Sequence, residues 1–142
     1  MIFRIFTLLT LFSSFALASD RAAIEKLDGI EVFAFGGVGF AGTTSEGEIA
    51  FKQVFKSASA ESDFLELLKT GNAQSRCYAL VGLRLKNRLL FDEQVKSFTS
   101  SKQEVQTCAG CIMMKLPMSS VVASIERGNY DKQAMAKPKK LP

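Results

Sequence analysis

The sequence predicts a mainly α-helical single domain, in which short helices pack as antiparallel pairs in the manner of an α-superhelix, with a glycine-rich loop and one or two short strands. Three observations favour this class. Apolar residues recur at helical spacing in successive segments between residues 45 and 99. Residues typical of helix starts and stops flank those segments. Glycine-rich and polar clusters at residues 36–42 and 97–102 separate them from the rest of the chain.

The first 18 residues have the pattern of a secretory signal peptide. Arg4 precedes an apolar run over residues 5–15, and Ala16-Leu17-Ala18 supplies the small-x-small site that signal peptidase cleaves. We therefore expect cleavage after Ala18 and a periplasmic or secreted protein with no transmembrane segment after cleavage, an uncleaved anchor being the alternative. The mature chain divides into one helical domain, residues 19–131, and a flexible basic tail, residues 132–142.

Helix signals follow one another along the domain. The first helix is expected over residues 19–27. Ser45 and Glu48 form a capping box, which predicts a helix to about residue 56. Asn72 is a second candidate cap, and Gly71 is expected to end the preceding helix in the left-handed conformation. The remaining helices are predicted over residues 60–70, 73–86, 89–99 and 121–127.

Two segments lack helical spacing. Residues 30–35 are predicted to form a strand or a buried extended segment. Residues 105–116 alternate between short apolar and polar runs, which favours one strand or an irregular segment that ends at Pro117.

Composition excludes several functions. The net charge of +4 arises largely from the tail, because residues 19–131 contain thirteen basic and fourteen acidic residues, so nucleic-acid binding is not expected. The chain has no histidine, which removes the usual general base and the commonest metal ligand. We predict no catalytic site, no cofactor and no metal site, and the pairing of Glu46 with Glu48 is explained by capping.

The glycine-rich segment matches the dinucleotide fingerprint at Gly37-x-Gly39-x-x-Gly42. The helix signal begins only at Ser45, after the glycines, and no second strand follows, so nucleotide binding is not favoured. Two alternatives are a tight loop packed between helices and a loop that binds a peptide or glycan through its free amides. The candidate binding residues of the second alternative are Gly37, Gly39, Phe40, Gly42, Thr43 and Thr44.

The three cysteines predict one structural disulfide in an oxidising compartment. Cys108 and Cys111 are the simplest pair, with Cys77 as the alternative partner of either, although Cys77 lies on an apolar helical stripe and is expected to be a buried free thiol. Cys108-x-x-Cys111 is also the spacing of thiol-redox sites, but Pro117 follows too closely for a helix to open there. Three cysteines without histidine fall short of four zinc ligands.

Met113, Met114 and Met118 form a methionine-rich stretch next to these cysteines. We expect them to pack in the core. The alternatives are an adaptable sticky surface and a soft copper site.

Five motifs together resemble a family of small exported bacterial proteins of unknown function, some of which accompany microcin gene clusters. The similarity spans residues 30–131, and the resemblance implies a partner role but no catalytic residues. The matching motifs are Gly36-Gly37-Val38-Gly39-Phe40-Ala41-Gly42, Ser45-x-Gly47-Glu48-x-Ala50-Phe51, Cys77-Tyr78-Ala79-Leu80-Val81-Gly82-Leu83, Gly110-Cys111-Ile112 and Ile125-Glu126-x-Gly128-x-Tyr130-Asp131.

These observations predict a non-enzymatic binding or accessory module that meets a protein, peptide or glycan partner outside the cytoplasm. A thiol-redox accessory protein that uses Cys108 and Cys111 is one alternative, and an immunity or accessory factor for an antibacterial peptide is another.

Overall fold

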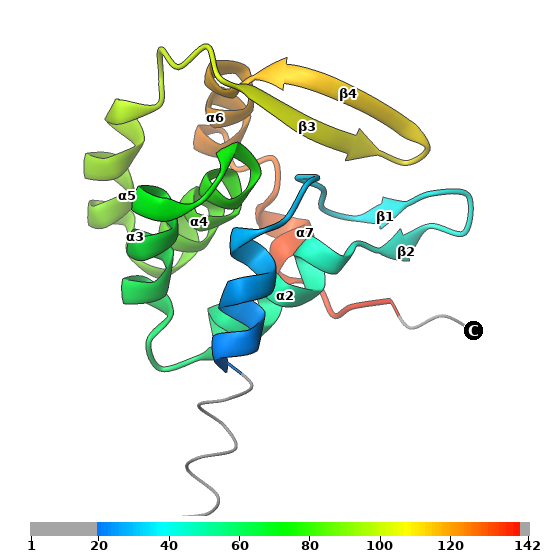
Figure 1. Ribbon diagram of the computed structural model, residues 1–142, viewed down its shortest axis with the longest axis horizontal. Helices are drawn as coiled ribbons and strands as arrows, with labels where there is room; N and C mark the ends of the chain where they lie inside the picture. The colour runs from blue at the N-terminus through cyan, green and yellow to red at the C-terminus, as the bar shows by residue number, and fades with distance from the viewer. Residues whose placement is uncertain (1–19, 140–142) are drawn as a thin grey trace, which may run out of the picture.

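The computed structural model describes residues 20–139 and confirms the mainly helical class, with two small antiparallel sheets of two strands each (Figure 1). The predicted signal peptide, residues 1–18, lies outside the described residues. No helix within residues 20–139 is long and apolar enough to cross a membrane. An N-terminal helix over residues 20–28 precedes the following elements: β1 (Gly37–Val38), β2 (Thr43–Thr44), α2 (Glu46–Lys56), α3 (Ala60–Thr70), α4 (Ala73–Lys86), α5 (Arg88–Gln94), the 3-10 turn η1 (Val95–Ser97), β3 (Glu104–Ala109), β4 (Ile112–Pro117), α6 (Met118–Glu126) and α7 (Asp131–Met135).

Helix α4 forms the centre of the core. Cys77 and the six residues after it are all buried, and α3, α5 and α6 pack around this helix. The α3–α4 contact is especially close at Gly82, where a Cβ atom would lie 2.3 Å from Cε2 of the buried Phe64 ring. Glycine at this position therefore lets two helices approach, at the cost of its low helix propensity.

The predicted caps are found at both helix starts. The Ser45 side chain accepts a hydrogen bond from the Glu48 amide at 3.1 Å, and the Asn72 side chain accepts one from the Ser75 amide at 2.9 Å. The prediction for Gly71 is wrong, because its φ is −71°. A Cβ atom there would lie 2.6 Å from the Leu67 carbonyl oxygen, so close packing, and not a left-handed backbone, requires the glycine.

The C-terminal part differs from its prediction in two places. Helix α6 begins three residues earlier than expected, at Met118, whose amide donates to the Gln103 carbonyl at 2.7 Å. Helix α7 covers the start of the segment predicted to be a flexible tail from residue 132, and its Ala134 is buried against the core.

Residues 104–117 form a β-hairpin, not the single strand or irregular segment that was predicted. Ala109 pairs with Ile112, which leaves Gly110 and Cys111 as a two-residue turn. Gly110 has a φ of +58°, and no non-glycine residue in the described chain has a positive φ. Glycine at the first of two central positions is typical of the type II′ turn, whose twist suits a tight hairpin.

The glycine-rich segment forms a second, shorter hairpin. Gly37 pairs with Thr44 and Val38 with Thr43, and Gly39 and Gly42 in the connecting loop have φ values of +71° and +61°. The alternative of a tight loop packed between helices is wrong, since β1 and β2 project away from the helices beside β3 and β4 (Figure 1).

Candidate functional site

The two hairpins lie side by side and are hydrogen-bonded to each other. The Gly39 amide donates to the Gly110 carbonyl at 2.8 Å, which joins one loop to the other. Closer to the core, the Phe33 amide donates to the Gln106 carbonyl at 2.8 Å, so the predicted extended segment at residues 30–35 runs along β3. We call the part formed by residues 36–44 and 105–114 the twin hairpin.

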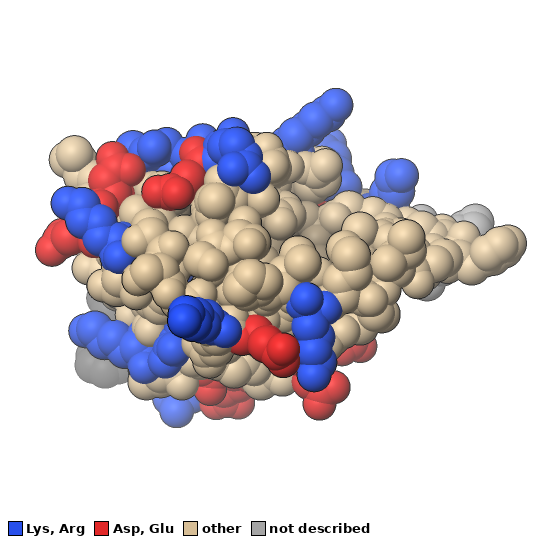
Figure 2. Space-filling model, turned by 90° about the horizontal axis from the view of Figure 1, so that it is seen from above, with Lys and Arg blue, Asp and Glu red and all other residues tan. Residues whose placement is uncertain are grey.

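The twin hairpin is apolar and uncharged. Neither of its segments contains a lysine, arginine, aspartate or glutamate. Figure 2 shows the projecting end as a tan surface, with the blue and red side chains gathered on the body of the molecule. Phe40 is 103% exposed and Ile112 is 64% exposed. Isolated exposed apolar residues are ordinary, but a cluster on a projecting, charge-free surface is typical of an interaction site.

The methionine prediction is correct only for Met118, which is buried in the core. Met113 and Met114 are 52% and 41% exposed on β4, which pairs edge to edge with β3 and is the outer strand of the hairpin (Figure 1).

A groove of about 670 Å³ opens between the twin hairpin and the first helical elements. Of the predicted binding residues, Gly39, Thr43 and Thr44 line it, whereas Gly37, Phe40 and Gly42 do not. Its remaining wall is formed mainly by aliphatic and backbone atoms, with charges at Lys26, Glu31 and Glu46: Lys26, Gly29, Ile30, Glu31, Val32, Ala34, Val38, Ser45, Glu46, Gly47, Cys108 and Met113.

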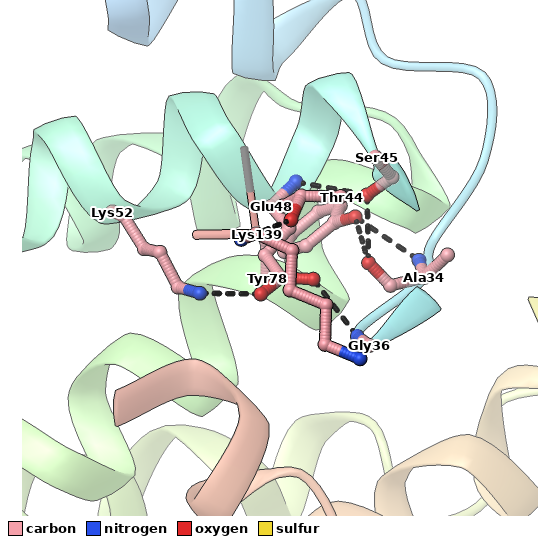
Figure 3. Close-up of polar contacts among 8 residues, drawn as sticks. All are labelled: Ala34, Gly36, Thr44, Ser45, Glu48, Lys52, Tyr78 and Lys139. Atoms are coloured by element: carbon pink, nitrogen blue, oxygen red, sulfur yellow. Dashed lines mark hydrogen bonds and ion pairs between the residues drawn. The ribbon is translucent and has the colours of Figure 1, made fainter. Parts of the chain in front are cut away.

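A buried polar network holds the base of β1 against α2 (Figure 3). The Glu48 side chain is 4% exposed and forms an ion pair with Lys52, whose side chain is 8% exposed. The other Glu48 carboxylate oxygen, Oε2, accepts a hydrogen bond from the Gly36 amide at 2.8 Å. In a complete capping box this carboxylate would bind the Ser45 amide, so only half of the predicted box is present. Glu48 is a structural residue that sequence analysis assigned to capping alone.

Tyr78 holds Ala34, which lies two residues before Gly36 in the same segment. Its hydroxyl donates to the Ala34 carbonyl at 2.8 Å and accepts from the Ala34 amide at 3.0 Å. Burial raises the pKa of Tyr78 to about 12, so the hydroxyl remains protonated as this donor. A Cβ atom at Gly47 would lie 2.5 Å from the hydroxyl oxygen, so α2 approaches Tyr78 only because residue 47 is glycine.

Aromatic rings continue this support below the hairpin. Phe33 and Phe35 each make edge-to-face contacts with Tyr78, at centroid distances of 4.8 and 5.1 Å. Phe51 packs edge-on against Phe35 at 5.1 Å, and Tyr130 packs against Phe33 at 5.0 Å. Such pairs add about 0.5–1.5 kcal/mol each beyond burial, so these rings anchor the segment that leads into β1.

The C-terminal segment also reaches this region. The Lys139 amide donates to Thr44 Oγ1 at 3.1 Å, which places the chain after α7 beside β2.

The structure does not contain the predicted disulfide. Cys77, Cys108 and Cys111 are all free. Cys108 lies in β3 directly opposite Met113, whereas Cys111 lies in the turn, so the hairpin register does not place the two thiols as a direct cross-strand pair. Neither lies at a helix N-terminus, where a reactive redox thiol is activated.

Cys77 is buried, as predicted. Burial raises its pKa to about 12, so its thiol is inert at neutral pH.

Within the described residues, no group of three or more histidine, cysteine, aspartate or glutamate side chains is placed to hold a metal ion. Glu46, which lines the groove from α2, is paired with Lys26 at 3.4 Å. Comparison with known protein families, with curated proteins and with solved structures finds no match.

Proposed function

We propose that this protein is an exported, non-enzymatic binding module that acts in the periplasm or outside the cell. Its ligand is an extended, mainly apolar polypeptide segment of a partner, bound in the groove and against the exposed side chains of the twin hairpin. The observation that carries the proposal is the combination of a charge-free, apolar projection with a buried network that holds its base in place.

The composition of the groove favours a peptide over the other ligands considered. None of its lining residues is aromatic, so the groove offers a sugar ring no flat surface for stacking. Its one lysine is paired with Glu46, so it offers no basic patch to nucleic acid. Aliphatic side chains, two threonine hydroxyls and glycine backbone groups are the contacts that an extended apolar peptide uses.

A pre-formed hairpin pair is also suited to binding at low entropic cost. The interaction between Gly39 and Gly110 and the network around Glu48 fix the two loops before any ligand arrives. Ordering a free loop on binding would cost about 1–2 kcal/mol per residue, so this pre-organisation adds directly to affinity.

Photo-crosslinking in the cell envelope tests the proposal. A benzophenone amino acid takes the place of Phe40 in one variant and of Leu89 in α5 in the control; both positions are exposed and apolar, at 103% and 84%. We expect a crosslinked protein of discrete mass from position 40 only, with the attachment site in an apolar, extended segment of the partner. Equal crosslinking at both positions, or adducts to lipid alone at position 40, would contradict the proposal.

A further inference from the structure

The tip of the β3–β4 hairpin brings three sulfur atoms to one region. Cys108 and Met113 are a directly opposed cross-strand pair, and both line the groove. Directly opposed residues of an antiparallel pair have Cβ atoms about 4.5–5.5 Å apart. The thioether of Met113 and the thiol of Cys108 are therefore neighbours by register, a relation that the bare sequence does not reveal.

Cys111 adds a second thiol next to this pair. It is the second residue of the two-residue turn that joins Ala109 to Ile112, outside the paired strand residues. The Cys108 thiol points toward the same turn, because its Sγ lies 3.3 Å from the Gly110 carbonyl oxygen, so both cysteines lie at the tip of one hairpin. Met114 has the opposite strand parity to Met113 and pairs with Thr107 on the other face.

We propose that Cys108, Cys111 and Met113 form a three-sulfur site for monovalent copper at the tip of the β3–β4 hairpin. The site goes beyond the proposed binding function and does not depend on it. The free thiols and the thioether are soft donors, which select Cu(I) over harder cations.

These three sulfur ligands do not suit zinc or harder metal ions. Zinc takes four ligands in its structural sites, and the described residues place no third histidine, cysteine or carboxylate with the two thiols. The expectation of no metal site considered the cysteines as zinc ligands and the three methionines as a separate soft copper site, and did not join the two thiols with Met113. The hairpin register supplies the additional ligand, a methionine, that suits only a soft ion.

The surroundings allow the ion to enter. Cys111 is exposed, and Cys108 is half-buried with its Sγ 3.3 Å from the Gly110 carbonyl, a weak contact that a metal bond replaces. Binding releases one proton from each thiol, so Cu(I) and two thiolates carry a net charge of −1. Lys115 has the same strand parity as Met113, and its ammonium group is paired with Glu104 at 3.6 Å.

Competition with a chromophoric Cu(I) chelator under anaerobic conditions, on the fully reduced protein, tests the site. We expect one Cu(I) per chain, with X-ray absorption showing sulfur-only coordination by three atoms. Cys108→Ser and Cys111→Ser are each expected to weaken binding by at least about 100-fold, the upper end of the loss seen when even a supporting residue of a metal site is replaced.

Two methionine variants provide the matched comparison. Met113→Leu should weaken binding by about tenfold, which is 1.4 kcal/mol, and should lower the coordination number to two. Met114→Leu, one residue away and similarly exposed, should leave the Cu(I) affinity and the coordination number unchanged. Because Met113 and Met114 are both on the surface, neither substitution should disturb folding. Equal affinities of the two methionine variants, oxygen or nitrogen in the coordination shell, or undiminished binding by Cys108→Ser would overturn the proposal.

Discussion

Lys52→Met tests whether the buried ion pair holds the twin hairpin. Lys52 and Glu48 are 8% and 4% exposed at their side chains, so removal of the lysine leaves a carboxylate buried with the Gly36 amide as its remaining partner. Breaking a buried pair in this way costs about 3–5 kcal/mol, a large share of the 5–15 kcal/mol that stabilises an ordinary domain.

Urea denaturation followed by far-ultraviolet circular dichroism measures the loss. The control is Arg21→Met, which removes an ion pair of the same i,i+4 spacing whose side chains are 83% and 70% exposed; it should change stability by less than about 1 kcal/mol. The double variant Glu48→Gln/Lys52→Met removes both charges but keeps an acceptor for the Gly36 amide, and we expect it to be more stable than Lys52→Met alone. A Lys52→Met protein no less stable than the Arg21→Met control would refute the reasoning.

Three further predictions concern the core and its thiol. Gly82→Ala should destabilise the fold by about 1–3 kcal/mol in urea, because the new methyl group overlaps the buried Phe64 ring, and a gain from better helix propensity would contradict that packing. The contribution of Cys77 to stability should be independent of pH below about pH 8 and should become unfavourable above it, by about 3 kcal/mol at pH 11, because burial raises the pKa of Cys77 from 9.0 to about 12 and the unfolded chain therefore releases its proton first. The difference in stability between the unaltered protein and Cys77→Ala at the same pH values measures this contribution. At pH 8, thiol labelling with mass detection should modify Cys111 and Cys108 in the native protein and Cys77 only after unfolding; rapid native labelling at Cys77 would show that the core is open.

Local signals explain what the sequence could predict. Asn72 caps a helix through an amide three residues away, and Ser45 does the same, so each prediction depended on a few neighbouring residues. Gly82 and Gly47 are different, because the rings that exclude a Cβ atom at these positions belong to Phe64 and Tyr78, distant in sequence. A helical pattern shows that a glycine is present but not which partner requires it.

The candidate site depended on such distant contacts. Glu48 was assigned to capping because its spacing from Ser45 fits, yet its carboxylate reaches Gly36 and Lys52 inside the molecule. The strand prediction at residues 105–116 missed the hairpin because Gly110 was not recognised as the first residue of a two-residue turn. Glycine followed by cysteine is a permissible II′ turn, so this signal was present.

The loop prediction succeeded in part for a physical reason. Four closely spaced glycines exclude a regular helix, and Gly39 and Gly42 indeed adopt positive φ. What the pattern could not specify was that the loop would project beside a second hairpin and expose Phe40, because the Gly110 carbonyl that holds it lies about seventy residues away in the chain.

Amide hydrogen exchange, resolved by residue in the isolated protein, is the most direct test of the claim that the two hairpins form one pre-organised surface. The Gly39 amide should exchange slowly, at a rate close to that of the Phe33 amide, because each donates across to the β3–β4 hairpin at 2.8 Å. Exchange at Gly39 as fast as at the exposed Phe40 amide next to it would show that the hairpins move independently, and the account of a shared binding surface would be wrong.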